Sequence, residues 1–299
     1  MTPVPPHVRL LVLVFVLSGV SAFKICSYNV EKLSGHKAKN FRIMHTLTRV
    51  LSHYDLCLLL DVDSSAVRTL LAKLNRNADR YDDQFRYDTV TATSLDTNHM
   101  HHYVYFYRTK TVNVKARHQY QKVQSFTREP LAVQIHSRNT AIRDFILVPL
   151  HSEPSKAVQE MDRLYDVFQE VSRKWNNTNV MFLGDFHAGC TYMTRADKKK
   201  IRLFRNTSFS WLIGDKVDTT VTDDTTCPYD RIVVHGERFL KNIKPLSGQV
   251  VNIGKRFRVR RTLVQEISNH YPLEVILKSS ALLLQATPLL ALLSVVIAL

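Results

Sequence analysis

The chain has 299 residues, of which 45% are hydrophobic, and it contains only 8 glycines and 10 prolines. This balance excludes a collagen-like, low-complexity or largely disordered chain and is that of an ordinary globular protein. Lysine and arginine number 41 against 26 acidic residues, which gives a formal net charge of +15. Such an excess favours polyanionic partners such as nucleic acid, heparin-like chains or anionic membrane, although a generally basic soluble surface would have the same composition.

The first residues have the composition of a secretory signal peptide. A short basic start is followed by an apolar run that ends at the small residues Ser21-Ala22 and is too short to span a membrane. We therefore expect residues 1–22 to be removed in the secretory pathway. In a secreted chain, the sequons that begin at Asn176 and Asn206 predict N-glycosylation.

The last residues predict attachment to a membrane. Residues 281–299 are almost wholly apolar and uncharged, and a soluble domain does not leave such a tail in water. The small residues at 279–281 favour a glycolipid-anchor signal, whereas the missing polar spacer favours a short membrane anchor. We expect a mature domain at 23–278 and a tail at 279–299, located at the cell surface or in the endoplasmic reticulum lumen.

The four cysteines are candidates for disulfides in a secreted chain. Cys26 and Cys57 stand inside apolar strand patterns, so we expect them to be small buried residues. Cys190 and Cys227 stand in polar, loop-like surroundings, so we expect them to form the only disulfide.

Short, nearly continuous apolar runs predict strands that are covered on at least one face. These runs lie at 24–28, 56–62, 103–108, 145–150, 180–184, 231–234 and 273–277. Apolar residues repeat at helical spacing over 41–54 and 158–175, which predicts two amphipathic helices. Helices outside strand layers make an α/β sandwich, and no linker divides 23–278, so we expect one domain. The segment 238–261 is the least regular and most basic part of the chain.

Polar residues stand where the predicted strands end, and such side chains commonly converge in a cleft. The residues are Asn29, Asp61, His151, Asp185 with His187, Asp230 and His270. One polar strand end is usually a turn, but this set resembles the inventory of a metal-dependent phosphodiesterase.

The motifs around these residues follow one another in the order of a known family. They are Asn29, Arg128-Glu129-Pro130, Leu150-His151, Gly184-Asp185-Phe186-His187-Ala188-Gly189-Cys190, Tyr229-Asp230-Arg231 and Ser268-Asn269-His270-Tyr271-Pro272. As an ordered set over residues 23–278, they resemble the deoxyribonuclease I family within the endonuclease/exonuclease/phosphatase fold. Residues 233–238 and the apolar tail look closest to its membrane-anchored deoxyribonuclease X branch.

The resemblance implies a four-layer sandwich of two packed mixed β-sheets flanked by helices, acting as a monomeric domain on duplex DNA. It implies an acid/base imidazole at His270, held by Asp230, and a second catalytic imidazole at His151. Asp185 would help to activate and orient the attacking water. Asn29 would donate its amide to a phosphate oxygen whose charge grows in the transition state.

Two further residues are expected at the substrate. By the same resemblance, Arg128 would clamp phosphate with its planar guanidinium and Tyr229 would lie beside it. Each could instead pair with loop backbone.

Four positions depart from the family's pattern. Asp61 stands for a metal-binding Glu and is one methylene shorter, His187 stands for an Asn, and Asn269 stands for an Asp. The Glu that orients the imidazole matching His151 aligns with His101, which would leave His151 without a negative partner. We place the metal ligands at Asp61, His187 and Asn269. We expect weakened binding of Mg²⁺, which could act together with Ca²⁺ or Mn²⁺.

The extra histidines open a second interpretation of the metal site. Imidazole favours transition metals, so His187 with His99, His101 or His102 could bind Zn²⁺ or Cu²⁺. A solvated loop explains this histidine-rich run without any metal, and we favour that interpretation.

Three functions are compatible with this pattern. The first is an endonuclease of weakened activity that hydrolyses DNA phosphodiester bonds in the secretory or extracellular space. The second is a catalytically inactive DNA-binding or cell-surface recognition protein on the same fold. The third is a phosphatase or lipid-directed relative, which we rank last because the Arg-Glu-Pro motif and the cysteine-bearing loop follow the deoxyribonuclease pattern.

Overall fold

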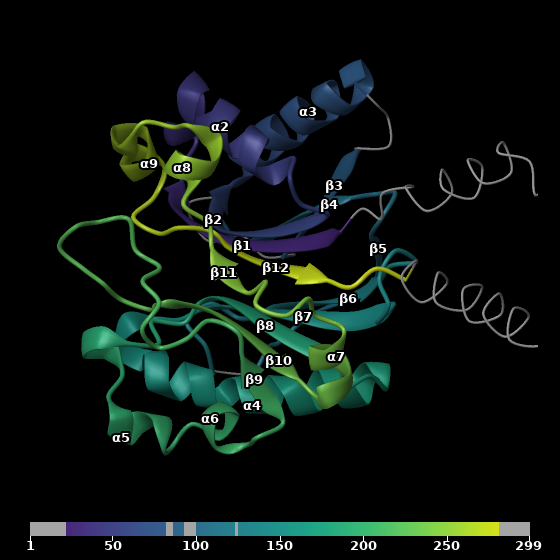
Figure 1. The fold of residues 1–299 in the computed structure, drawn as a ribbon, viewed down its shortest axis with the longest axis vertical. Helices are drawn as coiled ribbons and strands as arrows, with labels where there is room; N and C mark the ends of the chain where they lie inside the picture. The colour runs from purple at the N-terminus through teal and green to yellow at the C-terminus, as the bar shows by residue number, and fades with distance from the viewer. Residues whose placement is uncertain (1–21, 82–85, 93–99, 123–124, 281–299) are drawn as a thin grey trace, which may run out of the picture.

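The computed structural model describes residues 22–280 apart from 82–85, 93–99 and 123–124. Two sheets of six strands pack face to face, and helices cover both outer faces (Figure 1). The first sheet has the order β11 (Gln249–Val250), β12 (Leu273–Leu277), β1 (Phe23–Leu33), β2 (Leu56–Asp63), β4 (Met100–Arg108), β3 (Tyr87–Thr91). The second has the order β5 (Asn113–Gln119), β6 (Leu131–His136), β7 (Asp144–His151), β8 (Val180–Asp185), β10 (Asp230–His235), β9 (Phe209–Trp211).

Both sheets contain parallel and antiparallel pairs. In the first sheet, β1 pairs in parallel with β2 and antiparallel with β12. In the second sheet, β8 pairs in parallel with β7 and antiparallel with β10. The predicted α/β sandwich of two mixed sheets flanked by helices is therefore confirmed.

Helices close the sandwich on each side because their apolar faces cover the outer surface of a sheet. The first sheet is covered by α2 (Phe41–Leu51), α3 (Ser64–Tyr81), α8 (Ile253–Phe257) and α9 (Arg261–Ile267). The second sheet is covered by α4 (Ala157–Trp175) and α6 (Arg202–Arg205), whereas α5 (Arg195–Lys198) buries no residue and α7 (Glu237–Lys241) follows β10. Short 3₁₀ turns lie at Lys37–Lys39, Pro154–Lys156 and Cys190–Tyr192.

Helix α2 shows how the sequence makes such an element. The side chain of Asn40 accepts hydrogen bonds from the backbone N–H groups of Arg42 and Ile43. Those donors have no partner inside the helix, so the cap stabilises its start. Apolar residues three and four positions apart then place Met44 and Leu47, both fully buried, against the first sheet.

Every predicted strand and both predicted helices are present, with their ends shifted by a few residues. Helix α3 and strand β5 are not predicted from the sequence. Residues of β5 alternate between exposed and half-buried, so this edge strand has no apolar run. An edge strand can be polar because only one of its sides pairs with the sheet.

The prediction of a single disulfide is wrong. Cys190 and Cys227 are bonded as expected, and Cys26 and Cys57 are bonded as well. Cys26 and Cys57 are partners in the parallel register of β1 and β2, and their Cα atoms are 4.3 Å apart. Both residues are buried, as predicted. Burial in a strand does not exclude pairing when the neighbouring strand carries the second cysteine at the same level.

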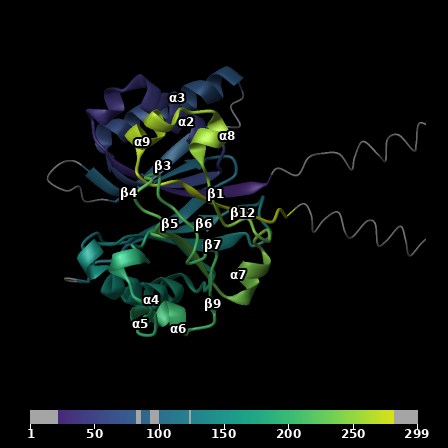
Figure 2. The same ribbon diagram turned by 60° about the vertical axis from the view of Figure 1, so that its left-hand side comes forward.

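The two ends of the described domain lie at the same end of the sandwich (Figure 2). Phe23 of β1 pairs with Leu277 of β12, and Ser279 forms a bridge with Thr140, just before β7. Strands β1, β2, β7 and β8 start near this end and carry their last residues to the opposite end. No helix within the described residues is long and apolar enough to cross a membrane.

Candidate active site

Polar side chains from both sheets meet at the end of the sandwich opposite to the chain ends. Asn29 of β1 donates from Nδ2 to Asp185 Oδ2 of β8 at 2.9 Å, which links the first sheet to the second. The register of the second sheet places Asp185 beside His151 of β7 and Asp230 of β10. Asp185 is therefore the centre around which the predicted residues gather.

The close approach of β7 and β8 at this point depends on glycine. Gly184 has a φ of 137°, and a Cβ atom built on it would lie 2.0 Å from the carbonyl oxygen of Leu150. Any other residue would push the two strands apart. The Gly-Asp pair of the motif thus sets the distance between Asp185 and the end of β7.

His270 and Asp230 form the tightest ionisable pair at this end. His270 Nδ1 lies 2.7 Å from Asp230 Oδ2, and both side chains are buried. Nε2 of the same ring lies 3.6 Å from Asp185 Oδ2. Ser268 Oγ accepts from the backbone N–H of His270 and donates to the carbonyl oxygen of Asn29. These two bonds fix the backbone of His270. Burial alone would lower the pKa of His270, but the carboxylates of Asp230 and Asp185 outweigh it and raise the pKa to about 9.

His151 also faces Asp185 and also has a carboxylate behind it. Its Nε2 lies 3.8 Å from Asp185 Oδ2, and its Nδ1 lies 3.2 Å from Asp61 Oδ2. The expectation that His151 lacks a negative partner is therefore wrong. The carboxylate comes from β2, where Asp61 has a left-handed φ of 52° that interrupts the regular alternation of the strand.

Asp61 is shared among several donors. Its Oδ1 accepts from His102 Nδ1 at 3.0 Å, and its Oδ2 lies 4.0 Å from Arg128 Nε. Burial would raise the pKa of Asp61, but the hydrogen bond from His102, the nearby imidazole of His151 and the charge of Arg128 hold it well below its ordinary value. Asp61 is an ionised carboxylate whose two oxygens both face hydrogen-bond donors.

His187 follows β8 and lies next to His151. The two rings are nearly parallel, with centroids 6.3 Å apart. His187 Nδ1 lies 3.1 Å from Ser152 Oγ and 3.4 Å from Asp185 Oδ1. Burial lowers the pKa of His187 against the opposing charge of Asp185. This imidazole is therefore mainly neutral at pH 7 and is part of the wall of the site.

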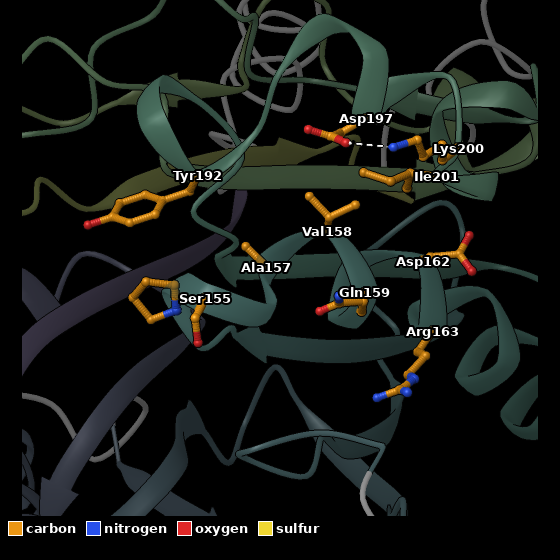
Figure 3. Close-up of a pocket in the computed structure, with 11 residues that line it drawn as sticks. Ser155, Ala157, Val158, Gln159, Asp162, Arg163, Tyr192, Asp197, Lys200 and Ile201 are labelled. Carbon is orange, nitrogen blue, oxygen red and sulfur yellow. Dashed lines mark hydrogen bonds and ion pairs between the residues drawn. The ribbon is translucent and has the colours of Figure 1, made fainter.

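Two tyrosines border the site on the side of the second sheet. The ring centroids of Tyr229 and Tyr192 lie 5.4 and 5.1 Å from that of His187. Tyr192 also stands at one end of a groove of about 510 Å³, whose other end is marked by Asp162 and Arg163 (Figure 3). The groove passes along the start of α4, and Tyr192 belongs both to its lining and to the surroundings of His187. Of the expected substrate residues, Tyr229 is therefore at the site and half-buried.

Arg128 lies at the same end of the sandwich but is engaged within the protein. Its Nη1 donates to the carbonyl oxygen of His151 at 3.4 Å and lies 3.6 Å from Glu153 Oε2. Its side chain is 18% exposed. Arg128 therefore borders the site, and it contacts loop backbone as well as carboxylates.

Glu160 supports this part of the site, and no motif in the sequence singles it out. Its fully buried carboxylate accepts from the backbone N–H groups of Thr127 and Glu153, at 2.8 and 3.0 Å. It thereby ties the segment before Arg128 and the turn after His151 to α4. Helical spacing places Glu160 on the buried stripe of α4, and a carboxylate on such a stripe is the signal that could have found it.

One group of acidic and histidine side chains among the described residues is compact enough to share a metal ion. It consists of Asp185, Asp230 and His270, whose ligand atoms lie within 4.8 Å of one another. Two buried carboxylates that already face each other across one imidazole fit a divalent cation, because the ion would offset their repulsion.

The three residues expected to bind metal lie differently. Asp61 does not fit an ion well, because the guanidinium of Arg128 lies 4.0 Å from its Oδ2 and His102 donates to its Oδ1. His187 faces Ser152 with Nδ1. Asn269 is exposed, and its backbone N–H donates to Glu31 Oε2 at 3.1 Å. None of the three belongs to the compact group found among the described residues.

The histidine-rich run does not form a transition-metal cluster within the part of the chain that the structure describes. His99 lies outside the described residues. His101 Nε2 lies 3.4 Å from Ser64 Oγ, whereas His102 faces Asp61. The two neighbouring histidines therefore have separate partners.

Solved structures with the same architecture define the class of fold. Humanized D. rerio TDP2 superposes with a TM-score of 0.60 at 14% identity, covering 85% of this chain and 98% of that one. The endonuclease domain of the TRAS1 retrotransposon gives 0.55 at 15% identity, covering 86% and 99%. An endonuclease/exonuclease/phosphatase family protein from Bacteroides thetaiotaomicron gives 0.56 at 13% identity, covering 86% and 95%. The chain thus has the endonuclease/exonuclease/phosphatase fold.

Sequence relatives narrow this class to one family, although no protein-family model matches the chain. Deoxyribonuclease gamma of Rattus norvegicus is 35% identical over 288 residues, covering 93% of this chain and 92% of the relative. Deoxyribonuclease-1 of Homo sapiens is 37% identical over 279 residues, covering 90% and 97%. Deoxyribonuclease-1-like 1 of Chlorocebus aethiops is 36% identical over 275 residues, covering 90% and 89%. The chain belongs to the deoxyribonuclease I family, as its motifs predict.

Proposed function

We propose that this chain is an endonuclease that hydrolyses phosphodiester bonds of duplex DNA with a divalent metal ion, at a rate weakened by its altered positions. One observation carries the proposal. Two imidazoles, His270 and His151, face Asp185 at 3.6 and 3.8 Å, and each has a carboxylate at its other nitrogen. In a chain of the deoxyribonuclease I family, this arrangement suits proton transfer during cleavage of a phosphorus–oxygen bond.

The protein residues would divide the chemistry as follows. Asp185 orients a water molecule whose oxygen forms the new bond to phosphorus. One imidazole, at His151 Nε2 or His270 Nε2, accepts a proton from that water, and the other gives a proton to the leaving oxygen as its bond to phosphorus breaks. Asn29 donates from Nδ2 to the phosphate oxygen on which charge accumulates.

A divalent ion would supply charge neutralisation and polarise a phosphate oxygen. Asp185 and Asp230 would hold it, and we propose Mg²⁺, with Ca²⁺ or Mn²⁺ as alternatives. Asn269 lacks the charge of the family's Asp, and Asp61 is engaged by His102 and His151. Both changes support weakened binding of the ion.

A plasmid-nicking assay tests the proposed activity. The full chain should convert supercoiled DNA to the open circle in Mg²⁺ or Mn²⁺ and should stop when EDTA is added. The variant His270→Ala should lose the activity. His235→Ala is the matched control, because His235 is half-buried and lies at the other end of β10, away from Asp230. Folded wild-type protein that nicks no DNA in any divalent ion would refute the proposal.

The second candidate is a DNA-binding or cell-surface recognition protein without catalysis. The engaged carboxylate of Asp61 and the uncharged Asn269 favour it. It predicts that labelled duplex DNA binds in fluorescence anisotropy, with loss of binding at high salt, while the same protein nicks nothing.

We also propose that the protein is secreted, glycosylated and attached to a membrane as a monomeric domain. Two disulfides support an oxidising compartment, and the apolar residues 281–299 support attachment. Asn176 is exposed at the end of α4, where a glycan has room, and Asn206 follows α6. Phospholipase treatment of cells should release a glycolipid-anchored protein, whereas a protein that stays bound has a membrane anchor.

A further inference from the structure

We infer that Asp61 is a positioning residue, which holds the imidazole of His151 through Nδ1, and is not a ligand of the metal ion. The inference concerns a residue that is expected, from the family's pattern, to bind metal. It deepens the proposed nuclease function and rests on it for its kinetic consequence, but its structural part stands on contacts alone.

The first support is the surroundings of His151 Nδ1. This atom is buried, and within the described chain it meets no partner in good hydrogen-bond geometry. Asp61 Oδ2 at 3.2 Å is at ion-pair distance, although the pair does not form a hydrogen bond in this ring orientation. A small rotation of the ring would align the two. A buried imidazole nitrogen without any partner is costly, so the carboxylate is what makes this ring orientation tenable.

The second support is that the rest of His151 is already fixed. Its backbone N–H donates to the hydroxyl of Tyr103 at 3.0 Å, and its strand pairs with β8 at Asp185. The remaining freedom is the rotation of the imidazole. A carboxylate at Nδ1 selects the rotation and the tautomer that leave Nε2 directed at Asp185.

The third support is the electrostatic setting of Asp61. His102 donates to Oδ1 from the solvent side, and the guanidinium of Arg128 lies 4.0 Å from Oδ2. A cation at Asp61 would have to displace these donors and would meet the charge of Arg128. Asp185 and Asp230 also face donors, the Asn29 amide and the His270 imidazole, but among the described residues no guanidinium pairs with either of them.

The experiment separates positioning from metal binding with two readouts on the full chain. Asp61→Asn keeps the shape of the side chain and removes its charge. Asp63→Asn is the matched control, because Asp63 ends the same strand and its carboxylate accepts from the neighbouring Ser65. Nitrogen-15 spectra of the histidines report the tautomer of His151, and electron paramagnetic resonance reports the affinity for Mn²⁺.

We expect Asp61→Asn to move the His151 nitrogen resonances away from the Nδ1-protonated form, while Mn²⁺ affinity changes less than threefold. The kcat of nicking should fall at least about tenfold, as for other partners that orient a histidine, with KM unchanged. Asp63→Asn should change neither readout. Asp61→Glu, which keeps the charge on a longer chain, should retain the Nδ1 proton and show an intermediate kcat.

Two outcomes would overturn the inference. One is an unchanged His151 spectrum in Asp61→Asn. The other is a tenfold or greater loss of Mn²⁺ affinity in that variant, which would make Asp61 a ligand. If the wild type cuts no DNA, the proposed function fails, yet the spectra still decide whether Asp61 holds His151. If Asp61→Asn does not fold, Asp61→Ser, which also removes the charge, supplies the same two readouts.

Discussion

His270 and His151 both face Asp185, but the carboxylates behind them differ in distance and in number of partners. Asp230 lies 2.7 Å from His270 and comes from the same sheet as Asp185, whereas Asp61 lies 3.2 Å from His151 and comes from the other sheet. Asp61 also accepts a hydrogen bond from a second imidazole, that of His102. The imidazole of His151 thus has a negative partner although the family's Glu is replaced by His101, but this partner lies farther away and is shared.

The largest effect should come from removing His270, the imidazole that lies closer to its carboxylate partner. His270→Ala should lower the rate of Mg²⁺-dependent nicking by at least about 100-fold, the usual size of a lost acid or base. His151→Ala should also slow the reaction, by a smaller factor, because its ring is held less firmly. Rates of open-circle formation measure both, with circular dichroism to confirm folding. A His270→Ala protein within threefold of the wild type would contradict the comparison.

The tighter pair should also be visible in the pH dependence of stability. The folded pKa of His270, about 9, lies above the unfolded value of about 6.5. The contribution of His270 to the free energy of unfolding is therefore fully present below pH 6.5 and is lost as the pH rises to about 9. Its upper size is about 3 kcal/mol. Urea unfolding with EDTA present should show this decline in wild type. If the free energy of unfolding of His270→Asn declines equally over the same pH range, His270 is not the cause of the decline.

Restoring two departures from the family's pattern tests the proposed weakening of the nuclease activity without changing Asp61. The double variant His187→Asn with Asn269→Asp should raise Mg²⁺-dependent nicking about tenfold, which needs only about 1.4 kcal/mol. The added carboxylate brings negative charge to the site, and the amide offers a neutral oxygen. The readout is the rate as a function of Mg²⁺ concentration. An unchanged Mg²⁺ dependence would place the weakness elsewhere.

The smallest effect should come from the second partner of Asp61. The side chain of His102 is 34% exposed, so its bond to Asp61 contributes about 0.5 kcal/mol at most. His102→Ala should change kcat by about two- to threefold, since Asp61 keeps its contact with His151. A loss as large as that of Asp61→Asn would show that His102 acts in the chemistry itself.

The fold and the members of the site could be predicted from the sequence, but the partners within the site could not. Asn29, His151 and Asp185 follow apolar runs of strands that pair in parallel, so those ends lie at one edge of the sandwich. Asp230 and His270 stand at or just before the starts of antiparallel strands, which lie at the same edge. Their gathering therefore follows from local patterns and motif order.

Contacts between side chains of the two sheets leave no local pattern in the sequence. The contact of Asp61 with His151 depends on a left-handed backbone at Asp61 and on how β2 meets β7. The Cys26–Cys57 disulfide likewise depends on the register between two strands that the sequence presents only as separate apolar runs. The motif order places Asp61 at the position of the family's metal-binding Glu. The contacts that Asp61 makes depend on how the two sheets pack, which the motif order does not show.

The response of Asp61→Asn to rising Mg²⁺ tests the account most directly. If Asp61 holds His151, the loss of kcat remains the same when Mg²⁺ is raised to saturation, because added metal cannot replace the missing partner of Nδ1. If Asp61 were a ligand, saturating Mg²⁺ would restore the wild-type rate, and that recovery would contradict the account.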